Sequence, residues 1–191
     1  MELLGEKENV ELWDILDKNG KKTGKTVERS KDCLSRGEYH LVVHIWILGS
    51  DGRVLIQRRS FDKPLMPGEW AATGGSALSG EESVVAAQRE LCEEVGIALE
   101  KEDFLLVKRV PRRNSLLDIY FVRCNVAASE LKIQTEEVSE VCWVHRNKLK
   151  QMIKSGEYHN YGEEYFGIIF DAFKKISEAN RKRRKRRING R

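Results

Sequence analysis

Long apolar runs are absent from this 191-residue chain, and none approaches the roughly 18 residues that a membrane-spanning helix needs. The first eight residues are acidic and contain no apolar signal-peptide core. These two absences argue against a membrane-spanning or secreted protein. We therefore expect a cytoplasmic protein that makes no membrane contact.

Paired cysteines are also absent. The four cysteines, Cys33, Cys92, Cys124 and Cys142, are scattered, and no two of them form a CxxC pair. We interpret them as free thiols in a reducing compartment. Cys92 falls inside a predicted helix, where we expect it to pack in the core.

Acidic residues are missing from the last segment, residues 181–191, which carries eight basic side chains. Removing eight positive charges from the formal net charge of +4 leaves −4, so the rest of the chain is mildly acidic. We expect this tail to be disordered or a frayed helix end. It is either a solvated extension of the last helix or a contact for nucleic acid or another polyanion.

Internal repeats and long linkers are absent as well, so we predict a single domain over residues 1–180, with a core at about 10–150 and a helical extension over 163–180. Hydrophobic periodicity and turn residues predict a mixed sheet with helices packed on it, an α/β or α+β architecture that opens with a β-hairpin turning at Asn19-Gly20. The predicted strands are 11–16, 22–28, 39–48, 53–58, 70–72, 104–109, 116–126 and 138–144, and the predicted helices are 82–95, 147–154 and 163–179.

One motif dominates the sequence. Residues 75–97 read G-x5-E-x7-R-E-U-x-E-E-x-G-U, where U is an apolar residue. With average residue frequencies this pattern would arise by chance in roughly one chain in ten million of this length. The fixed positions are Gly75, Glu81, Arg89, Glu90, Leu91, Glu93, Glu94, Gly96 and Ile97.

The spacing of the acidic residues indicates a metal site. Glu90, Glu93 and Glu94 share one face of the predicted helix, where three like charges repel unless a cation lies between them. Carboxylate oxygens are hard ligands that suit Mg²⁺ or Mn²⁺. Arg89 stands four residues before Glu93 and is placed to hold its carboxylate. The alternatives are a solvated Glu-rich helix and a degenerate, inactive motif.

The motif resembles the signature box of the Nudix family, and the resemblance covers about residues 10–150. It continues in the strand at 55–60, in Pro67-Gly68-Glu69-Trp70 followed by Gly74-Gly75, and in the strand at 138–144. This resemblance implies the Nudix fold and Mg²⁺-dependent hydrolysis of a nucleoside diphosphate linked to a group X, with Mn²⁺ as a second candidate metal.

Carried over to this sequence, the resemblance implies roles for individual residues. The metal ligands are Glu90, Glu93 and Glu94, with the Gly75 carbonyl as a further candidate. The base that activates water is Glu94 or an acid of the 136–140 loop, for which we take Glu137. With Glu93 and Arg89, these complete the predicted catalytic set.

Substrate contacts are predicted less directly. Arg58, Arg59 and Lys63 are candidates to clamp phosphate, and Trp70 is a candidate to stack on a base. Each of them is equally consistent with a surface or core-packing role. Asp118 is a weak candidate for a further acid. We expect the loops 29–38, 59–69 and 155–165 to select the group X.

A finer resemblance concerns the subgroup related to isopentenyl diphosphate isomerase. It rests on residues 11–17, 24–26, 39–41 and 44–46. That isomerase needs a cysteine and a histidine in the loop that opens the box, and here Thr73-Gly74-Gly75-Ser76-Ala77 contains neither. We therefore favour hydrolysis over isomerisation.

Two further functions remain open: an RNA-end hydrolase that uses the tail 181–191, and a ligand-binding regulator without turnover. A homodimer is plausible for this fold. His40 and His44 are four apart on a strand, about 13 Å between Cα atoms, and so cannot share one ion.

Overall fold

The computed structural model describes residues 10–30 and 33–189, with side chains described as far as residue 179. The mixed sheet, the flanking helices and the N-terminal hairpin predicted from the sequence are confirmed. The elements in chain order are β1 (Leu12–Leu16), β2 (Lys22–Glu28), β3 (His40–Leu48), β4 (Val54–Arg59), β5 (Trp70–Ala71), α1 (Ser83–Val95), β6 (Leu105–Pro111), β7 (Ser115–Arg123), β8 (Val138–Val144), α2 (Arg146–Ser155) and α3 (Glu163–Asn189).

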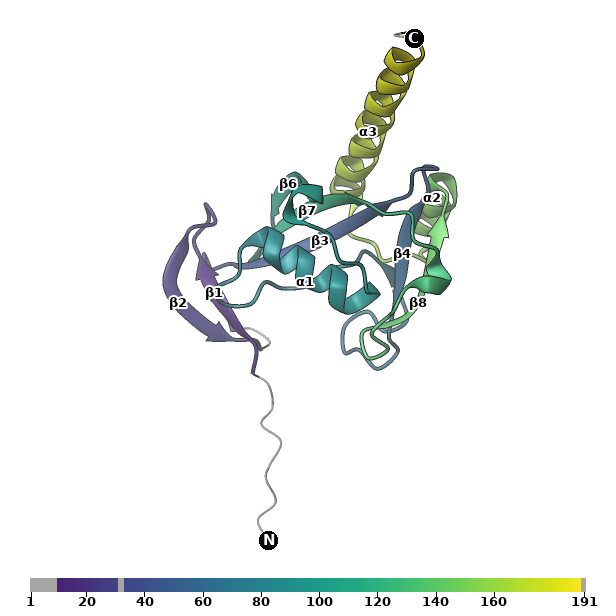
Figure 1. Cartoon of the computed structure of the whole chain (residues 1–191). Coiled ribbons are helices and arrows are strands. Elements are labelled where there is room, and N and C mark those ends of the chain that lie inside the picture. The colour runs from purple at the N-terminus through teal and green to yellow at the C-terminus, as the bar shows by residue number, and fades with distance from the viewer. Residues whose placement is uncertain (1–9, 31–32, 190–191) are drawn as a thin grey trace.

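The main sheet runs in the order β5-β4-β3-β7-β6, and β8 also pairs with β4. The strands β3 and β7 are parallel along their whole length, whereas the other pairs are antiparallel. α1 covers one face of this sheet, and α2 and α3 lie on the other side (Figure 1).

Alternating side chains of β3 divide the interior into two cores. Val43, Ile45 and Ile47 pack against α1, in a cluster that also holds Leu91 and Val95. Trp46 and Leu48 point the other way, into a cluster with α2 and α3. This two-residue period is the one expected of a strand buried on both faces.

The candidate site lies where two neighbouring strands of the sheet separate. β3 and β4 pair only through Ile47 with Leu55 and Leu48 with Val54, and then diverge. The segment 70–77 enters the gap: β5 pairs with β4, and the chain then bonds to β3 through the carbonyls of Thr73 and Gly75. A glycine-rich segment therefore replaces a continuous strand pairing at this point.

The N-terminal hairpin β1-β2 is a separate two-stranded sheet beside the body (Figure 1). Its Asp17 carboxylate accepts hydrogen bonds from the backbone N–H groups of Asn19 and Lys21, which stabilise the predicted turn. Asp14 fastens the hairpin to the loop before α1 by accepting from Ser79 Oγ at 2.8 Å and from the Gly80 N–H at 2.9 Å.

The last helix differs from expectation in its length. The sequence predicted a disordered tail or a frayed helix end from residue 181, whereas α3 continues to Asn189 and its far end projects out of the body (Figure 1). No helix in the described part of the chain is both long and apolar enough to cross a membrane. Cys92 is exposed, so the expectation that it packs in the core was wrong.

Candidate active site

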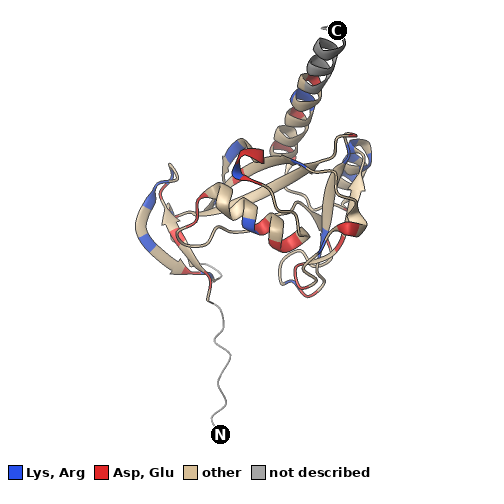
Figure 2. Cartoon of the chain, in the orientation of Figure 1, with Lys and Arg blue, Asp and Glu red and all other residues tan. Residues whose placement is uncertain are grey.

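The end of α1 sets the position of the predicted metal ligands. Gly96 stops the helix in the left-handed conformation, with φ at 71°, and its N–H bonds to the Cys92 carbonyl at 3.0 Å. Leu91 and Val95 are fully buried and fix the rotation of the helix about its axis. The acidic face, Glu90, Glu93 and Glu94, is thereby presented beside the glycine segment. In Figure 2 the ribbon of this part of α1 is red at acidic positions, next to a blue basic one.

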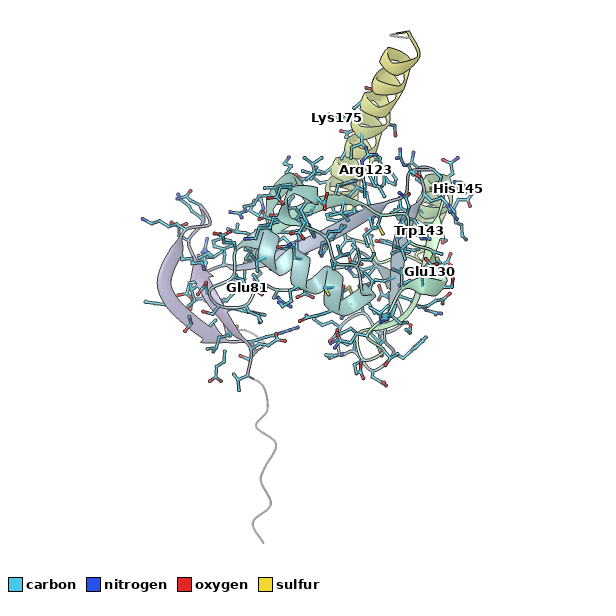
Figure 3. All side chains as sticks on the ribbon, viewed as in Figure 1. Glu81, Arg123, Glu130, Trp143, His145 and Lys175 are labelled. Carbon is cyan, nitrogen blue, oxygen red and sulfur yellow. The ribbon has the colours of Figure 1, made fainter. Side chains whose placement is uncertain are left out.

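Arg89 connects several residues of the motif through hydrogen bonds. Its guanidinium donates to both oxygens of Glu81 at 2.8 and 3.0 Å and to the Ser76 carbonyl at 3.0 Å. One of its nitrogens also reaches Glu90 at 2.9 Å and Glu93 at 3.0 Å. Figure 3 labels Glu81, just ahead of α1. These bonds make Arg89 a residue that orients the carboxylates; the structure gives it no separate role in the chemistry.

Glu94 is the most deeply placed acid of the motif, with 3% of its surface exposed. Its Oε2 accepts from the Gly74 N–H at 2.9 Å and from Gln57 Nε2 at 3.0 Å. Burial, and then the charge of Glu90, raise the pKa of Glu94 to about 8 although both hydrogen bonds favour the charged form.

Glu90 lies against the glycine segment. A Cβ added at Gly75 would overlap the Glu90 carboxylate, so a larger residue there would displace this side chain. Burial raises the pKa of Glu90 to about 7, with a smaller contribution from Glu93, while Arg89 opposes the shift. The surroundings therefore favour the protonated form of both carboxyl groups, whereas a bound cation would favour the charged form.

A cleft of about 810 Å³ opens over these carboxylates. Its lining is balanced in charge, with five acidic and five basic side chains. They are Glu11, Glu90, Glu93, Glu94 and Glu137, and Arg29, Arg59, Lys63, Arg89 and Arg112.

Most of the cations in the cleft are already paired. Arg29 bonds to Glu11 at 2.5 Å, Lys63 bonds to Glu137 at 2.7 Å, and Arg89 holds Glu90 and Glu93. Within the described residues, Arg59 and Arg112 form no ion pair with a carboxylate. Positive charge is thus available to an anion at these two positions.

The donor atoms fit a hard divalent cation, although the ligands are not gathered around one point. In the part of the chain that the structure describes, no three His, Cys, Asp or Glu side chains stand in an arrangement that would hold a metal ion. Both donors to Glu94 reach Oε2, and Arg89 reaches only Oε1 of Glu90. One oxygen of each buried carboxyl group is therefore left without a hydrogen-bond donor among these residues, as a cation ligand requires.

The structure divides the predicted substrate residues into two groups. Arg59, Lys63 and Glu137 line the cleft. Arg58 and Trp70 lie outside it: Arg58 donates to the Gly68 carbonyl at 2.8 Å, and Trp70 is 9% exposed within the core on the α2–α3 side. Arg58 and Arg59 face opposite sides because they are adjacent in a strand, and a substrate role for Arg58 and Trp70 stays a prediction.

Asp118 does not serve the cleft either. It is fully buried and paired with Arg109 at 2.6 Å, and it accepts from Ser83 Oγ at 2.5 Å. These partners satisfy the carboxylate, so Asp118 is a structural acid.

Sequence reasoning missed several residues that the fold brings to the site. Gln57 was hidden in a strand, and only its bond to Glu94 reveals its role. Arg112, His159 and Tyr161 line the cleft from segments far from the motif, as does His44. The loop 155–165, expected to choose the group X, supplies two of these.

The comparisons with known proteins agree with this geometry. The NUDIX domain family profile matches residues 38–161. An uncharacterized Nudix hydrolase of Listeria innocua is 39% identical over 153 residues, which cover 80% of this chain and 90% of that protein. Nudix hydrolase 3 of Arabidopsis thaliana is 32% identical over 188 residues, which cover 89% of this chain but only 24% of that longer protein.

A solved structure supports the fold. The crystal structure of DR0079 from Deinococcus radiodurans aligns with a TM-score of 0.68 at 22% identity, and the alignment covers 83% of this chain and 97% of that one. The profile spans most of the sequence and the box is complete. The protein therefore belongs to the Nudix family of hydrolases.

Proposed function

We propose that this protein is a Mg²⁺-dependent hydrolase that cleaves the diphosphate linkage of a nucleoside diphosphate joined to a group X, with Mn²⁺ as a possible substitute. The observation that carries the proposal is the pair of buried carboxyl groups, Glu90 and Glu94. Each has one oxygen without a donor, and both have a pKa raised toward neutrality. Such a pair is costly to the fold and is explained by a cation that binds it.

The proposed ligands are Glu90, Glu93 and Glu94, with the Gly75 carbonyl as a further one. That carbonyl accepts from the Val43 N–H at 2.9 Å and keeps a second lone pair. When bound, the metal neutralises the diphosphate and lowers the pKa of water. A bound diphosphate would add negative charge beside these carboxylates, and the cation would offset it.

The chain's own residues bind the phosphates and accept the proton. Arg59 and Arg112 offer unpaired positive charge, and Lys63 can exchange Glu137 for a phosphate oxygen. That exchange would free the Glu137 carboxylate. Two bases are therefore in place for the attacking water, Glu94 and Glu137.

The isomerase-like alternative receives no support from the loop that opens the box. Thr73 is buried, and its carbonyl bonds to Ile45. Gly74 is required by close backbone contacts and Gly75 lies against the Glu90 carboxylate, so this loop offers no thiol or imidazole to move a proton. We therefore propose hydrolysis for this member of the family.

The test is product release from a panel of nucleotide sugars, dinucleotides and nucleoside triphosphates with Mg²⁺ or Mn²⁺. We expect Glu94→Gln to lower kcat by at least about 100-fold. The control is Glu140→Gln, because Glu140 is exposed and only 3.9 Å from Arg58, outside the cleft; its kcat should stay within about twofold. Wild-type turnover that survives Glu94→Gln would refute the proposal.

Glu137→Gln identifies the base. If Glu137 takes the proton, its variant should lose as much kcat as Glu94→Gln while metal affinity is kept. If Glu94 takes it, Glu137→Gln should change KM more than kcat, because Lys63 loses its partner.

A further inference from the structure

The cleft has a second half, on the other side of the glycine segment from the carboxylates. Gly74 marks the boundary: its N–H bonds to Glu94 Oε2 at 2.9 Å, and a Cβ added to it would lie 3.0 Å from the Cα of His44. Beyond it, the cleft is lined by His44, Arg112, His159 and Tyr161. This half faces the core formed with α3, and none of its members belongs to the box.

His44 is held by a buried chain of hydrogen bonds. Its Nδ1 lies 2.8 Å from the Tyr165 hydroxyl, and the same hydroxyl accepts from Trp46 Nε1 at 2.9 Å. All three side chains are buried. An indole nitrogen can only donate, so one lone pair of the Tyr165 oxygen is occupied by Trp46.

The direction of the bond to His44 follows from counting protons. The Tyr165 hydroxyl has one hydrogen, and His44 Nδ1 is its only available acceptor among the described residues. If Nδ1 carried the proton instead, the hydroxyl hydrogen would be left without an acceptor in a buried place, which is costly. Tyr165 therefore donates to Nδ1, and the ring proton of His44 resides on Nε2.

The ring of His44 stays neutral. Burial, together with the charges of Arg112 and His159, lowers the pKa of His44 to about 3. The Nε2 atom has no hydrogen-bond partner in the described part of the chain, and it is not among the fully enclosed unpaired atoms there. Because His44 lines the cleft, this N–H is a fixed donor that reaches the open space.

Arg112 adds a charge beside this donor. Its guanidinium carbon lies 5.9 Å from the ring centre of Tyr161 and 6.0 Å from that of Tyr165, so the two rings support it. It makes no ion pair with a carboxylate in the described residues. A neutral N–H donor next to an unpaired cation favours an oxygen that carries negative charge.

We propose that His44, fixed as the Nε2–H tautomer by Tyr165 and Trp46, and Arg112 together form a subsite that binds an anionic oxygen of the substrate. The subsite rests on the proposed function, since the oxygen belongs to the compound cleaved at the carboxylates. Either a diphosphate oxygen or an oxygen of the group X can supply it. Tyr165 and Trp46 are positioning residues in this scheme.

The first experiment observes the tautomer and needs no turnover. Histidine side-chain ¹⁵N NMR of the full-length protein should show His44 as Nε2–H, without titration, from pH 5 to 9. Tyr165→Phe should abolish this single tautomer. The matched control is Tyr158→Phe: that ring also packs on Trp46, at 6.2 Å, but its hydroxyl has no partner among the described residues. An Nδ1–H signal in the wild type, or an unchanged tautomer in Tyr165→Phe, would overturn the proposal.

The second experiment measures equilibrium binding of two probes that resist cleavage. They are methylenediphosphonate and α,β:β,γ-bismethylene-ATP, whose terminal phosphonate stands for the group X. We expect His44→Phe and Arg112→Gln each to weaken binding about five- to tenfold. Arg113→Gln is the control, because Arg113 is exposed and does not line the cleft. Arg112→Gln changes an exposed side chain, so it keeps the test valid if His44→Phe folds poorly.

The outcomes of the binding experiment separate the sources of the oxygen. Equal losses for both probes assign the oxygen to the diphosphate, and a loss for α,β:β,γ-bismethylene-ATP alone assigns it to the group X. Unchanged binding of both probes in both variants would overturn the subsite. Failure of the wild type to bind either probe would refute the proposed function itself, and with it the proposed role of the His44 Nε2–H group in binding substrate.

Discussion

Arg89 illustrates how much a single side chain can organise. Its guanidinium fork satisfies Glu81, Glu90, Glu93 and the Ser76 carbonyl at once. A lysine has the same charge but only a point-like ammonium group, and it cannot reproduce the fork. An Arg89→Lys substitution would therefore keep the positive charge of the site but lose the geometry of these hydrogen bonds.

We expect Arg89→Lys to lower the free energy of unfolding by about 1–3 kcal/mol, because several part-buried hydrogen bonds lose their donor. Urea denaturation measures this change. Arg53→Lys is the matched control: Arg53 pairs with Asp51 at 2.6 Å where both side chains are more than 40% exposed, so its effect should stay below about 0.5 kcal/mol. Equal effects of the two substitutions would contradict the central role of Arg89.

The two histidines of β3 make a second prediction at the residue scale. Burial lowers the pKa of His40 to about 4, with help from Arg29, and that of His44 to about 3. Unfolded histidine takes up a proton below about pH 6.5, whereas the folded ring stays neutral until pH 4 or lower. The free energy of unfolding contributed by these rings is therefore complete above pH 6.5 and is lost as the pH falls from there.

The expected loss is up to about 1.4 kcal/mol per pH unit for each ring. His40→Asn should reduce the difference in unfolding free energy between pH 7 and pH 5, measured by urea denaturation at both pH values. An unchanged difference in His40→Asn would contradict this prediction. Comparing variant with wild type isolates the histidine from Glu90 and Glu94, whose raised pKa values act in the opposite direction.

At the scale of elements, the segment 70–77 holds the site together. Gly74 has φ at 148°, and a Cβ added there would overlap the Val43 carbonyl oxygen. Its N–H also binds Glu94. A side chain here would push the segment away from β3 and from α1 together.

We expect Gly74→Ala to abolish turnover and to lower the free energy of unfolding by more than 2 kcal/mol, roughly, since backbone must move. Gly52→Ala is the control, because Gly52 has φ at 85° but nothing lies within 4 Å of an added Cβ. It should cost only about 1 kcal/mol and leave kcat unchanged. Wild-type activity in Gly74→Ala would show that this close approach is unimportant.

The strands and helices were predictable because each depends on a pattern of residues that are close together in the sequence. Alternation along β3 and the glutamate spacing of α1 depend on neighbours a few residues apart. Except at the end of α3, the predicted bounds lie within a few residues of those observed. The choice between Arg58 and Arg59 was not predictable in this way. Adjacent strand residues face opposite sides, and which side is the cleft depends on how the whole sheet is covered.

The second half of the cleft was beyond local patterns for another reason. Its central contact joins His44 to Tyr165 across 121 residues, and no spacing rule links them. The sequence assigned the loop 155–165 to the substrate only because the motif accounts for the diphosphate chemistry and leaves the choice of the group X to the surrounding loops. The identity of the contacting side chains required the fold.

At the scale of the whole molecule, charge is unevenly distributed. The eight basic residues of 181–191 belong to the end of the chain, while the remainder of the sequence is mildly acidic. α3 carries this sequence away from the sheet as far as Asn189 (Figure 1). We propose that the basic end acts separately from the cleft, as a contact for RNA or another polyanion.

Removing residues 180–191 should therefore leave kcat/KM for a small diphosphate compound within about twofold, while salt-dependent RNA binding is lost. Filter binding at several salt concentrations, alongside the turnover assay, measures both effects. A variant with glutamine at all Lys and Arg positions of 181–187 separates charge from helix length. RNA binding that persists in both variants would show that the basic end is not the contact.

The glycine segment between β3 and β4 has a consequence for how such a protein can change over generations. The acids that would cut the substrate come from one stretch, 83–95, on one face of the sheet. Tyr161 and His159 come from another stretch on the opposite face, and the two meet only across Gly74. Evolution can therefore keep the catalytic residues unchanged while it replaces the distant stretch, and so change the substrate without changing the reaction.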